Sequence, residues 1–288
     1  MSAGAVDRTE GRADLSMPGP AEPTGRVVTG SYAGRVLSGT GLVVARNWKA
    51  SQTRWYVVAT GLAEPLLYLL SIGIGVGGLV EGFTIDGQRV DYAAYVAPGL
   101  LAAAAMNGAV MDGSFNFFFR LKFDKVYTQQ LSTPLTPVAV GAGQLVSALL
   151  RGAMYSGFFL VAMTVLGLTS SWWAVLALPA AIMVGLAFGG MAMLATAYAK
   201  SFSDLEYVTL VTLPLFLFSA TFFPLGAFPG WLQPIVEWSP LYRGVVLCRE
   251  LTTGTPGWDS VISVIYLGIL GAVALWAVSR RLERLLLS

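Results

Sequence analysis

Three ionisable residues, Glu64, Asp112 and Arg151, lie inside long apolar stretches of this sequence. Each would cost roughly 2.5–3.5 kcal/mol at the centre of a membrane-crossing helix, so each is expected to face protein or water. Helical geometry places them roughly 9–20 Å from one surface, close enough for Arg151 to pair with Glu64 or Asp112. Two roles are open for such a pair: a link that holds helices together, or a polar element or gate of a transport route.

Other residue types that commonly carry chemistry are scarce. The chain has no histidine and a single cysteine, Cys248, which excludes histidine-based catalysis, histidine metal sites and an intrachain disulfide. No lysine follows a glycine, so there is no P-loop. The run Gly73–Gly78 matches a dinucleotide-binding pattern, but it ends an apolar stretch and lacks the strand and helix that this pattern needs. We therefore predict no catalytic residue, no metal site and no cofactor bound by this chain.

The composition indicates a membrane protein. Of 288 residues, 55% are hydrophobic and 12% are charged, whereas an average soluble domain has roughly 25% charged residues. A soluble fold of this length could not bury so much apolar surface, so a bilayer must serve as part of the solvent. The net charge of +2 is too small to indicate a nucleic-acid partner.

Six apolar stretches predict an all-α integral membrane protein with six transmembrane helices. Each has about the 20 residues needed to cross the hydrocarbon, and they lie near 56–80, 92–118, 138–167, 173–198, 207–226 and 260–279. Residues 1–30 are expected to form a disordered cytoplasmic tail, and residues 31–288 the transmembrane domain. Between 31 and 53, apolar residues alternate with Arg35, Arg46 and Lys49, which favours an amphipathic interfacial helix; the alternative is a solvated linker.

Basic residues are divided unequally between the two sides of this arrangement. Fourteen lie in the tail, the interfacial helix, the second-to-third and fourth-to-fifth connections and the C-terminus, whereas three lie on the opposite side: Arg89, Arg243 and Arg249. Short loops rich in lysine and arginine stay in the cytoplasm, so both termini are predicted to be cytoplasmic. An even number of spans agrees with this orientation.

The stretch from Phe222 to Leu251 is interrupted by prolines and is not continuously apolar. Proline breaks a spanning helix, and tryptophan favours the headgroup level of a membrane. We predict short re-entrant or interfacial helices on the outer side before the last span, packed against protein because irregular backbone cannot face lipid. The residues that define this segment are Phe223, Pro224, Pro229, Trp231 and Pro240.

A short basic and aromatic segment follows the second span. Phe123 and Tyr127 are four residues apart and share one face of a helix, which suits docking into a groove on a partner protein. The alternative is a membrane-surface helix that binds nothing. The residues assigned to this docking helix are Lys122, Phe123, Asp124, Lys125, Tyr127 and Gln130.

Several motifs are spread over the chain outside its N-terminal tail. They are Glu64-Pro65-Leu66-Leu67-Tyr68-Leu69, Tyr95-Val96-Ala97-Pro98-Gly99-Leu100, Thr133-Pro134-Leu135, Phe222-Phe223-Pro224-Leu225, Phe228-Pro229-Gly230-Trp231-Leu232 and Ser239-Pro240-Leu241. Together they resemble the type-2 ABC exporter permeases, and within them the NodJ and daunorubicin-resistance permease group. The motifs in the proline-broken segment are the most specific, because they fall where this family carries them.

The resemblance implies a permease subunit, itself without catalysis, that moves an amphipathic substrate outward through a bacterial cell membrane. Such a substrate is a glycolipid, a lipo-oligosaccharide or a hydrophobic drug. The resemblance also implies a separate cytoplasmic ATPase that binds ATP and Mg, with two ATPase copies joined to two permease copies among membrane lipids. In such proteins the helix after the second span, residues 120–132 here, couples closure of the ATPase to the membrane part.

Two other functional classes are alternatives. An ion-coupled secondary transporter could use Glu64 and Asp112 as proton sites, although that class usually shows internal repeats and none is found here. A lipid-modifying membrane enzyme would need paired carboxylates or an acidic metal-binding motif, and the acidic residues here are scattered. Association with an ATPase distinguishes the permease from both alternatives.

The distribution of basic residues makes a testable prediction about topology. Tags at either terminus should be reachable only from the cytoplasm, and a cysteine placed at Asp86 should react from outside with a membrane-impermeant maleimide in intact cells. Labelling in a Cys248→Ser background removes the native thiol as a source of signal. A C-terminal tag exposed on the outside would contradict the six-helix topology.

Overall fold

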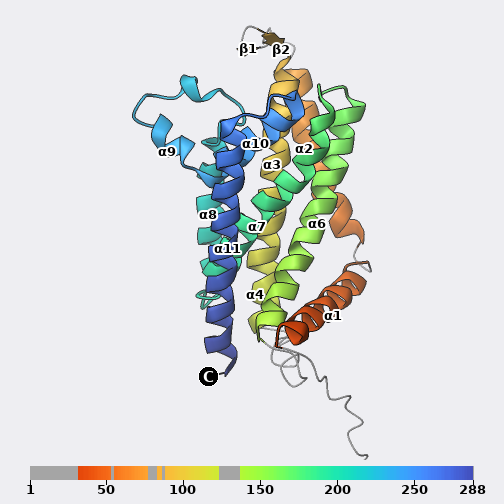
Figure 1. Ribbon diagram of the computed structural model, residues 1–288, viewed down its shortest axis with the longest axis vertical. Coiled ribbons are helices and arrows are strands. Elements are labelled where there is room, and N and C mark those ends of the chain that lie inside the picture. Colours follow the sequence, from red (N-terminus) through yellow and green to blue (C-terminus); the bar gives the residue numbers. More distant parts are fainter. Residues whose placement is uncertain (1–31, 53–54, 77–82, 86–87, 123–136, 288) are drawn as a thin grey trace, which may run out of the picture.

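The structure is a computed structural model of the chain, and it describes residues 32–52, 55–76, 83–85, 88–122 and 137–287. These residues fold into a helical bundle that carries one small antiparallel hairpin at one end (Figure 1). The all-α prediction is confirmed for the described part of the chain, apart from this hairpin. The predicted tail, residues 1–30, lies outside the described residues.

The elements follow the order of the predicted spans, with shorter helices between them. The first half contains α1 (Tyr32–Gln52), α2 (Trp55–Gly75), β1 (Phe83–Ile85), β2 (Gln88–Val90), α3 (Tyr92–Met111), the π-helix η1 (Asp112–Asn116) and α4 (Phe117–Lys122). The second half contains α6 (Pro137–Val165), the 3-10 helix η2 (Trp172–Leu176), α7 (Ala177–Thr196), α8 (Asp204–Leu217), the 3-10 helix η3 (Leu225–Ala227), α9 (Gln233–Glu237), α10 (Pro240–Thr253) and α11 (Trp258–Leu287).

Four helical segments in the described part of the chain are long and apolar enough to cross a membrane. They are Tyr92–Lys122, Ala139–Val165, Trp172–Thr196 and Trp258–Leu282, and they agree closely with four of the predicted spans. α2 covers most of the first predicted span. The fifth predicted span, 207–226, differs, because α8 has only 14 residues and ends at Leu217. That length corresponds to about 21 Å of helix.

The backbone after α8 is held in an irregular conformation by side chains from α3 and α10. Ala220 has a φ of 54°, a left-handed conformation that residues other than glycine seldom adopt. Its carbonyl oxygen accepts hydrogen bonds from Arg249 Nη2 at 2.9 Å and from the hydroxyl of Tyr95 at 3.4 Å. The Arg249 guanidinium in turn lies 4.0 Å from the centroid of the Tyr95 ring. These contacts satisfy a carbonyl that a continuing helix would have used itself.

The proline-broken segment forms the short helices that its sequence predicts, η3 and α9, before α10 begins at Pro240. α10 packs against α3, α7 and α11, and its residues Leu241 and Val245 are fully buried. The segment is only partly covered within a single copy of the chain. That its irregular backbone packs against protein stays a prediction. Around α9, the side chains of Trp231 and Trp238 are 73% and 70% exposed.

α3 forms the centre of the bundle, because it packs against α6, α7 and α10. Nearly all of its surface is buried, including the four successive alanines Ala102–Ala105. Small side chains let helices approach closely in a membrane, where packing holds helices together in place of the hydrophobic effect. The close approach continues at Gly113, where a Cβ atom would lie 2.7 Å from the carbonyl oxygen of Gly189 in α7.

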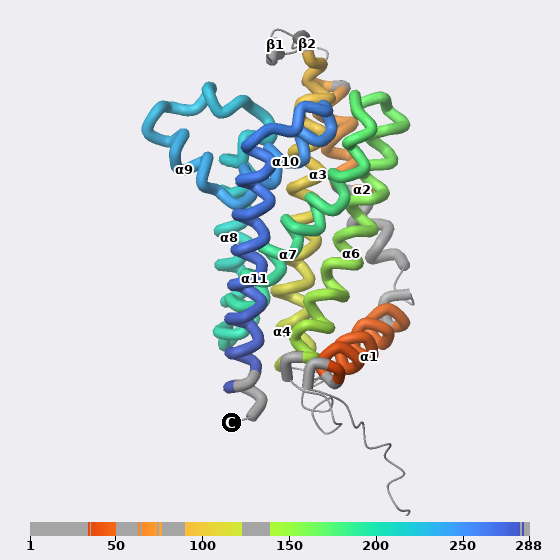
Figure 2. Tube along the Cα trace, in the orientation of Figure 1, coloured from red at the N-terminus to blue at the C-terminus, as the bar shows by residue number. Residues whose placement is uncertain are grey.

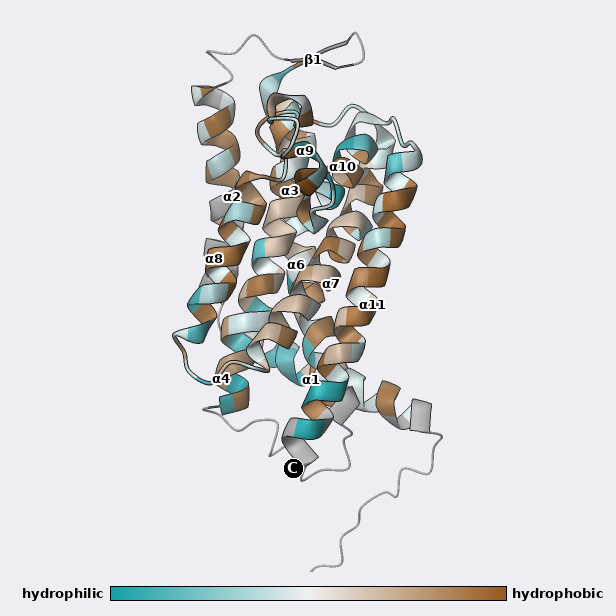
Figure 3. Cartoon of the chain, turned by 90° about the vertical axis from the view of Figure 1, so that its left-hand side faces the viewer, coloured by the Kyte–Doolittle hydropathy of each residue, from teal (hydrophilic) through white to brown (hydrophobic). Residues whose placement is uncertain are grey.

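The two ends of the bundle carry different elements. α1, the end of α4 and the C-terminal end of α11 lie together at what we call the α1 end, whereas the β1–β2 hairpin, α9 and α10 lie at the hairpin end (Figure 1). α1 runs obliquely across the foot of α6 and packs against it (Figure 2). Hydrophobic residues cover the helices between the two ends, and hydrophilic residues gather around α1 and α4 (Figure 3).

The close contact at Gly113 predicts a specific cost of adding one methyl group. Gly113→Ala should destabilise the bundle by about 1–3 kcal/mol, because neither the α7 backbone nor its own helix can easily move aside. Gly152→Ala in α6 is the matched control, since a Cβ there would meet nothing within 4 Å. Thermal unfolding in mild detergent should show a lower midpoint for Gly113→Ala and an unchanged or higher one for the control. Equal midpoints for the two variants would contradict this packing.

Candidate functional site

A buried carboxylate marks the point where α3 passes into α4. Asp112 is 3% exposed and lies within the apolar segment Tyr92–Lys122, nearer to its C-terminal end. Its Oδ2 atom lies 3.0 Å from Nε of Arg151 in α6, and its Oδ1 atom accepts a hydrogen bond from the side-chain amide of Asn116. Both oxygens therefore have partners, which is the condition under which a charge is tolerated at this depth.

The helix changes its winding at this carboxylate. Residues Asp112–Asn116 form one turn of π-helix between α3 and α4, and the hydroxyl of Ser114 donates a 2.5 Å hydrogen bond to the carbonyl of Val110. π-Helical turns inside α-helices are rare and occur frequently at functional sites. Here the turn brings the side-chain amide of Asn116 to Asp112 and sets Gly113 against α7.

Arg151 supplies the positive charge of the pair. Its side chain is 18% exposed, and its Nε–H is not aligned for a regular hydrogen bond with Asp112, so the contact is an ion pair. Among the side chains that the structure describes, no acceptor contacts its outer guanidinium nitrogens. The described residues thus leave those two nitrogens open to another group at this position.

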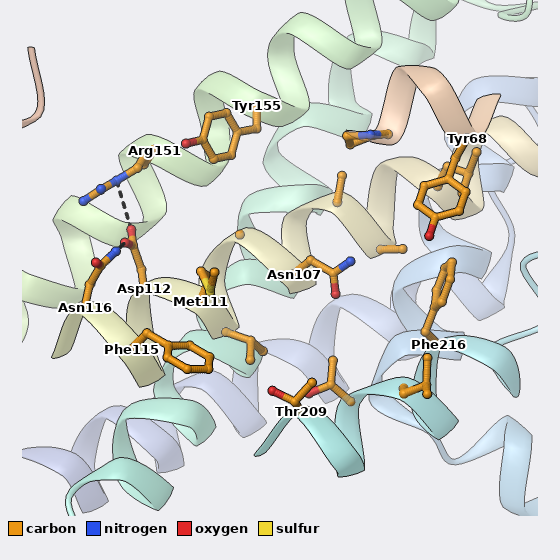
Figure 4. A pocket seen from close by; sticks show the side chains of 18 residues that line it. Tyr68, Asn107, Met111, Asp112, Phe115, Asn116, Arg151, Tyr155, Thr209 and Phe216 are labelled. Atoms are coloured by element: carbon orange, nitrogen blue, oxygen red, sulfur yellow. Dashed lines mark hydrogen bonds and ion pairs between the residues drawn. The ribbon is translucent and has the colours of Figure 1, made fainter. Parts of the chain in front are cut away.

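The ion pair stands at one end of a cavity of about 500 Å³ between α2, α3, α6 and α8 (Figure 4). Asn107 lies midway along this cavity, and Tyr68 and Phe216 lie at the end away from the ion pair (Figure 4). The remaining wall is mainly apolar. The lining residues are Pro65, Tyr68, Leu100, Ala103, Ala104, Asn107, Gly108, Val110, Met111, Asp112, Phe115, Asn116, Arg151, Tyr155, Thr209, Thr212, Leu213 and Phe216.

A second polar cluster ties α1 to the rest of the bundle at the α1 end. Arg120 in α4 donates to Oδ1 of Asn47 at 2.9 Å and to Oε1 of Gln144 at 2.7 Å. The amide nitrogen of Asn47 donates to Gln144 Oε1 at 3.2 Å and to the hydroxyl of Ser147 at 3.0 Å. We call these four residues the α1 clamp. Asn47, Gln144 and Ser147 are buried, so the clamp joins α1, α4 and α6 away from solvent.

Of the residues singled out in the sequence, the structure brings together Asp112 and Arg151. Glu64 lies in α2, one residue before the cavity-lining Pro65, but its side chain is outside the described part of the chain. Lys122 ends α4 and is exposed. The other residues of the predicted docking helix lie outside the described residues: Phe123, Asp124, Lys125, Tyr127 and Gln130.

The residues predicted for the outer segment lie together at the hairpin end and take no part in the cavity. Phe223 is 56% exposed, and Pro224 precedes η3. The carbonyl of Pro229 accepts a 2.8 Å hydrogen bond from the backbone of Leu232, which turns the chain into α9. Pro240 occupies the first turn of α10, where its missing N–H costs nothing.

Sequence reasoning missed Asn107, Asn116 and Thr209 of the cavity, and the whole α1 clamp. Asn116 could have been found from its spacing, since it stands four residues after Asp112 in an otherwise apolar helix. Asn107 stands between Met106 and Gly108 in the same helix, where a lone amide is a signal in its own right.

The geometry of the ion pair predicts how charge removal should act. Arg151→Ala should lower the yield of folded protein, because an unpaired buried charge costs about 3–5 kcal/mol, and adding Asp112→Asn should restore it. Adding Glu64→Gln instead should not restore it, because the described partner of Arg151 is Asp112. The measurement is the monodisperse yield in detergent for the single and double variants. Rescue by Glu64→Gln to the same extent would show that the assigned partner is wrong.

Comparison with known proteins shows the family to which the chain belongs. Residues 39–252 match the family described as ABC-2 type transporter. Nodulation protein J of Rhizobium meliloti (strain 1021) is 31% identical over 240 residues, which are 80% of this chain and 87% of that protein. Nodulation protein J of Rhizobium leguminosarum bv. viciae is 31% identical over 216 residues, 73% of this chain and 82% of that protein.

A more distant relative has a transport function in its name. The probable doxorubicin resistance ABC transporter permease protein DrrC of Mycobacterium tuberculosis (strain CDC 1551 / Oshkosh) is 23% identical over 235 residues, 74% of this chain and 78% of that protein. The resemblance seen in the sequence motifs is confirmed by these matches. This chain belongs to the ABC-2 type transporter family and is a multi-pass membrane permease subunit of an ABC exporter.

Proposed function

We propose that two copies of this chain and two copies of a cytoplasmic ATPase form an exporter that moves an amphipathic molecule outward across the cell membrane of a bacterium. The observation that carries the proposal is the cavity between α2, α3, α6 and α8, where a buried ion pair stands beside a mainly apolar wall. Such a cavity suits a molecule with a polar and an apolar part, such as a glycolipid, a lipo-oligosaccharide or a hydrophobic drug.

In this proposal the chain crosses the membrane six times, through α2, α3 with α4, α6, α7, α8 with the residues that follow it, and α11. The α1 end faces the cytoplasm, together with both termini. The basic residues Arg46, Lys49, Lys122 and Arg280 belong to elements at that end, which agrees with the preference of lysine and arginine for cytoplasmic loops. α9 and α10 then form the interfacial and re-entrant part of the outer side.

α1 is the interfacial helix of this arrangement. Its apolar side chains divide into two sets: Val43 packs inward and is 2% exposed, whereas Leu37 and Leu42 are 73% and 66% exposed. Leucine side chains that are free of protein contacts bury themselves readily in the acyl region of a leaflet. The α1 clamp fixes the opposite face of the helix to α4 and α6.

The ATPase binds ATP and Mg, and this chain receives the resulting motion. α4 ends at the exposed Lys122, so the predicted docking helix begins where the bundle ends on the cytoplasmic side. Arg120 stands two residues earlier and belongs to the α1 clamp. A push on the docking helix would therefore reach α1 and α6, and it would reach α3 through the π-helical turn that begins with Asp112.

The second copy of the chain completes the transport route. α2 and α8 flank the cavity, and each presents apolar side chains that nothing in one copy covers: Leu67 is 64% exposed, and Leu210 and Leu213 are 66% and 57% exposed. We place the second copy beside these helices. Rocking of the two copies then opens a path between them along α2, α3 and α8.

Loss of the docking helix's aromatic side chains tests the ATPase partnership. Phe123→Ala with Tyr127→Ala should leave the bundle folded and weaken binding of the ATPase by about 2 kcal/mol or more, roughly 30-fold in Kd, because large buried aromatic anchors dominate interfaces. The readouts are co-purification of the ATPase from membranes and ATP-dependent uptake of a fluorescent amphiphile into inside-out vesicles.

Phe223→Ala with Trp231→Ala is the matched control, since it too removes two aromatic side chains, both of them exposed and at the hairpin end. That variant should retain the ATPase. Full transport and normal ATPase binding in the Phe123/Tyr127 variant would show that the docking assignment is wrong. Absence of any co-purifying ATPase with the unaltered chain would refute the exporter itself.

A further inference from the structure

The cavity contains polar groups that the described residues leave without partners. Asn107 and Thr209 line the cavity and are exposed in a single copy of the chain, and their side chains make no hydrogen bond with another described residue. Thr212, one turn after Val208 on the same wall, is different, because its hydroxyl donates a 2.7 Å hydrogen bond to the Val208 carbonyl. An unpaired amide or hydroxyl costs several kcal/mol in hydrocarbon. Asn107 and Thr209 are therefore placed to meet a polar occupant.

The charges that the described residues bring to the cavity cancel. Asp112 and Arg151 are the charged residues among its described lining side chains, and they pair with each other at 3.0 Å. An ionic headgroup entering here would either break this pair or remain without a counter-charge in a region of low dielectric constant, and both are unfavourable. An uncharged headgroup meets no such penalty. It can accept hydrogen bonds from the outer nitrogens of Arg151 without displacing Asp112.

The rest of the wall suits an apolar group next to that headgroup. Met111 is one helical turn beyond Asn107, Phe115 is one turn beyond Met111, and both line the cavity with Leu213 and Phe216. In Figure 4 the ion pair and Asn116 stand at one end, Asn107 and Thr209 stand along the middle, and Tyr68 and Phe216 stand at the other end. Polar and apolar side chains thus alternate along the cavity. This arrangement suits one headgroup and the start of the apolar tail attached to it.

We infer that this cavity binds an amphiphile whose head carries hydroxyl groups and no net charge, with Asn107 and Thr209 as its contact residues. The inference rests on the proposed export function and adds the rule by which the site selects its ligand. Asn107 donates and accepts through one amide, Thr209 does so through one hydroxyl, and the Asp112–Arg151 pair stays intact beneath the bound head. Charged amphiphiles of the same chain length bind more weakly, because their headgroup charge would have no counter-charge in the cavity.

The experiment uses the complete permease–ATPase complex in lipid nanodiscs. Three photoreactive amphiphiles share one alkyl chain and one diazirine, and differ in the head: glucoside, phosphate or trimethylammonium. Competition by the corresponding unlabelled amphiphile gives an apparent Kd, and mass spectrometry of the labelled peptides locates the site on α3 and α8. We expect the glucoside to bind at least ~10-fold more tightly than either ion.

Variants then distinguish the loss of a contact with the ligand from a change in the packing of the cavity wall. Asn107→Leu and Thr209→Val are each expected to raise the Kd of the glucoside ~3–10-fold, the value of one hydrogen bond. Thr212→Val is the matched control and should leave that Kd unchanged, because the hydroxyl it removes is already bonded to its own helix. Thermal midpoints of all three variants establish that the complexes compared are folded, and Thr209→Val alone suffices if Asn107→Leu does not fold.

Two results would overturn the inference: tighter or equal binding of the phosphate or the ammonium probe, or an equal effect of Thr212→Val and Thr209→Val. Neither result bears on the exporter itself. Failure of the proposed function would appear instead as a permease without a bound ATPase, or as vesicles in which ATP drives no transport of any of the three amphiphiles.

Discussion

The ion pair between Asp112 and Arg151 determines how the neighbouring helices can be arranged. A carboxylate at this depth requires partners for both of its oxygens, and the chain provides Arg151 from α6 and Asn116 from one turn further on. The π-helical turn brings these groups into reach, and Gly113 in that turn allows α7 to come close. The positions of α6 and α7 against the central helix, and with them the cavity wall, thus depend on this one charge.

The length of the apolar stretches was enough to predict the all-α class and four long apolar helices of the described part of the chain. Four spans agree because long apolar helices have no other stable arrangement in a membrane, whatever their partners are. The fifth predicted span was too long, because the residues after Leu217 remain apolar while the backbone leaves the helix. That departure depends on Arg249 and Tyr95 contacting the carbonyl of Ala220, and a contact between residues so far apart in the chain has no local signature.

The candidate site was predictable only in part. The pairing of Arg151 with a buried carboxylate follows from the cost of isolated charge, but the sequence alone left Glu64 and Asp112 equally eligible. The choice of Asp112 as the partner depends on the π-helical turn, which no residue pattern predicted. For single polar residues such as Asn107 or Asn47, the sequence predicts no partner, because a lone amide can bond with any polar neighbour. Asn47 turned out to bond with residues about a hundred positions away.

The four successive alanines of α3 have a mechanical consequence. In a packed helix, a side chain larger than alanine must change rotamer before a neighbouring helix can slide past it, and it loses conformational entropy in the process. Alanine has no side-chain rotamers to rearrange, so Ala102–Ala105 present a smooth cylinder to the helices that surround them. Neighbouring helices can shift along such a cylinder without first unlocking interdigitated side chains. Ala102–Ala105 are thus the stretch of α3 along which a neighbouring helix can shift with no side chain to rearrange.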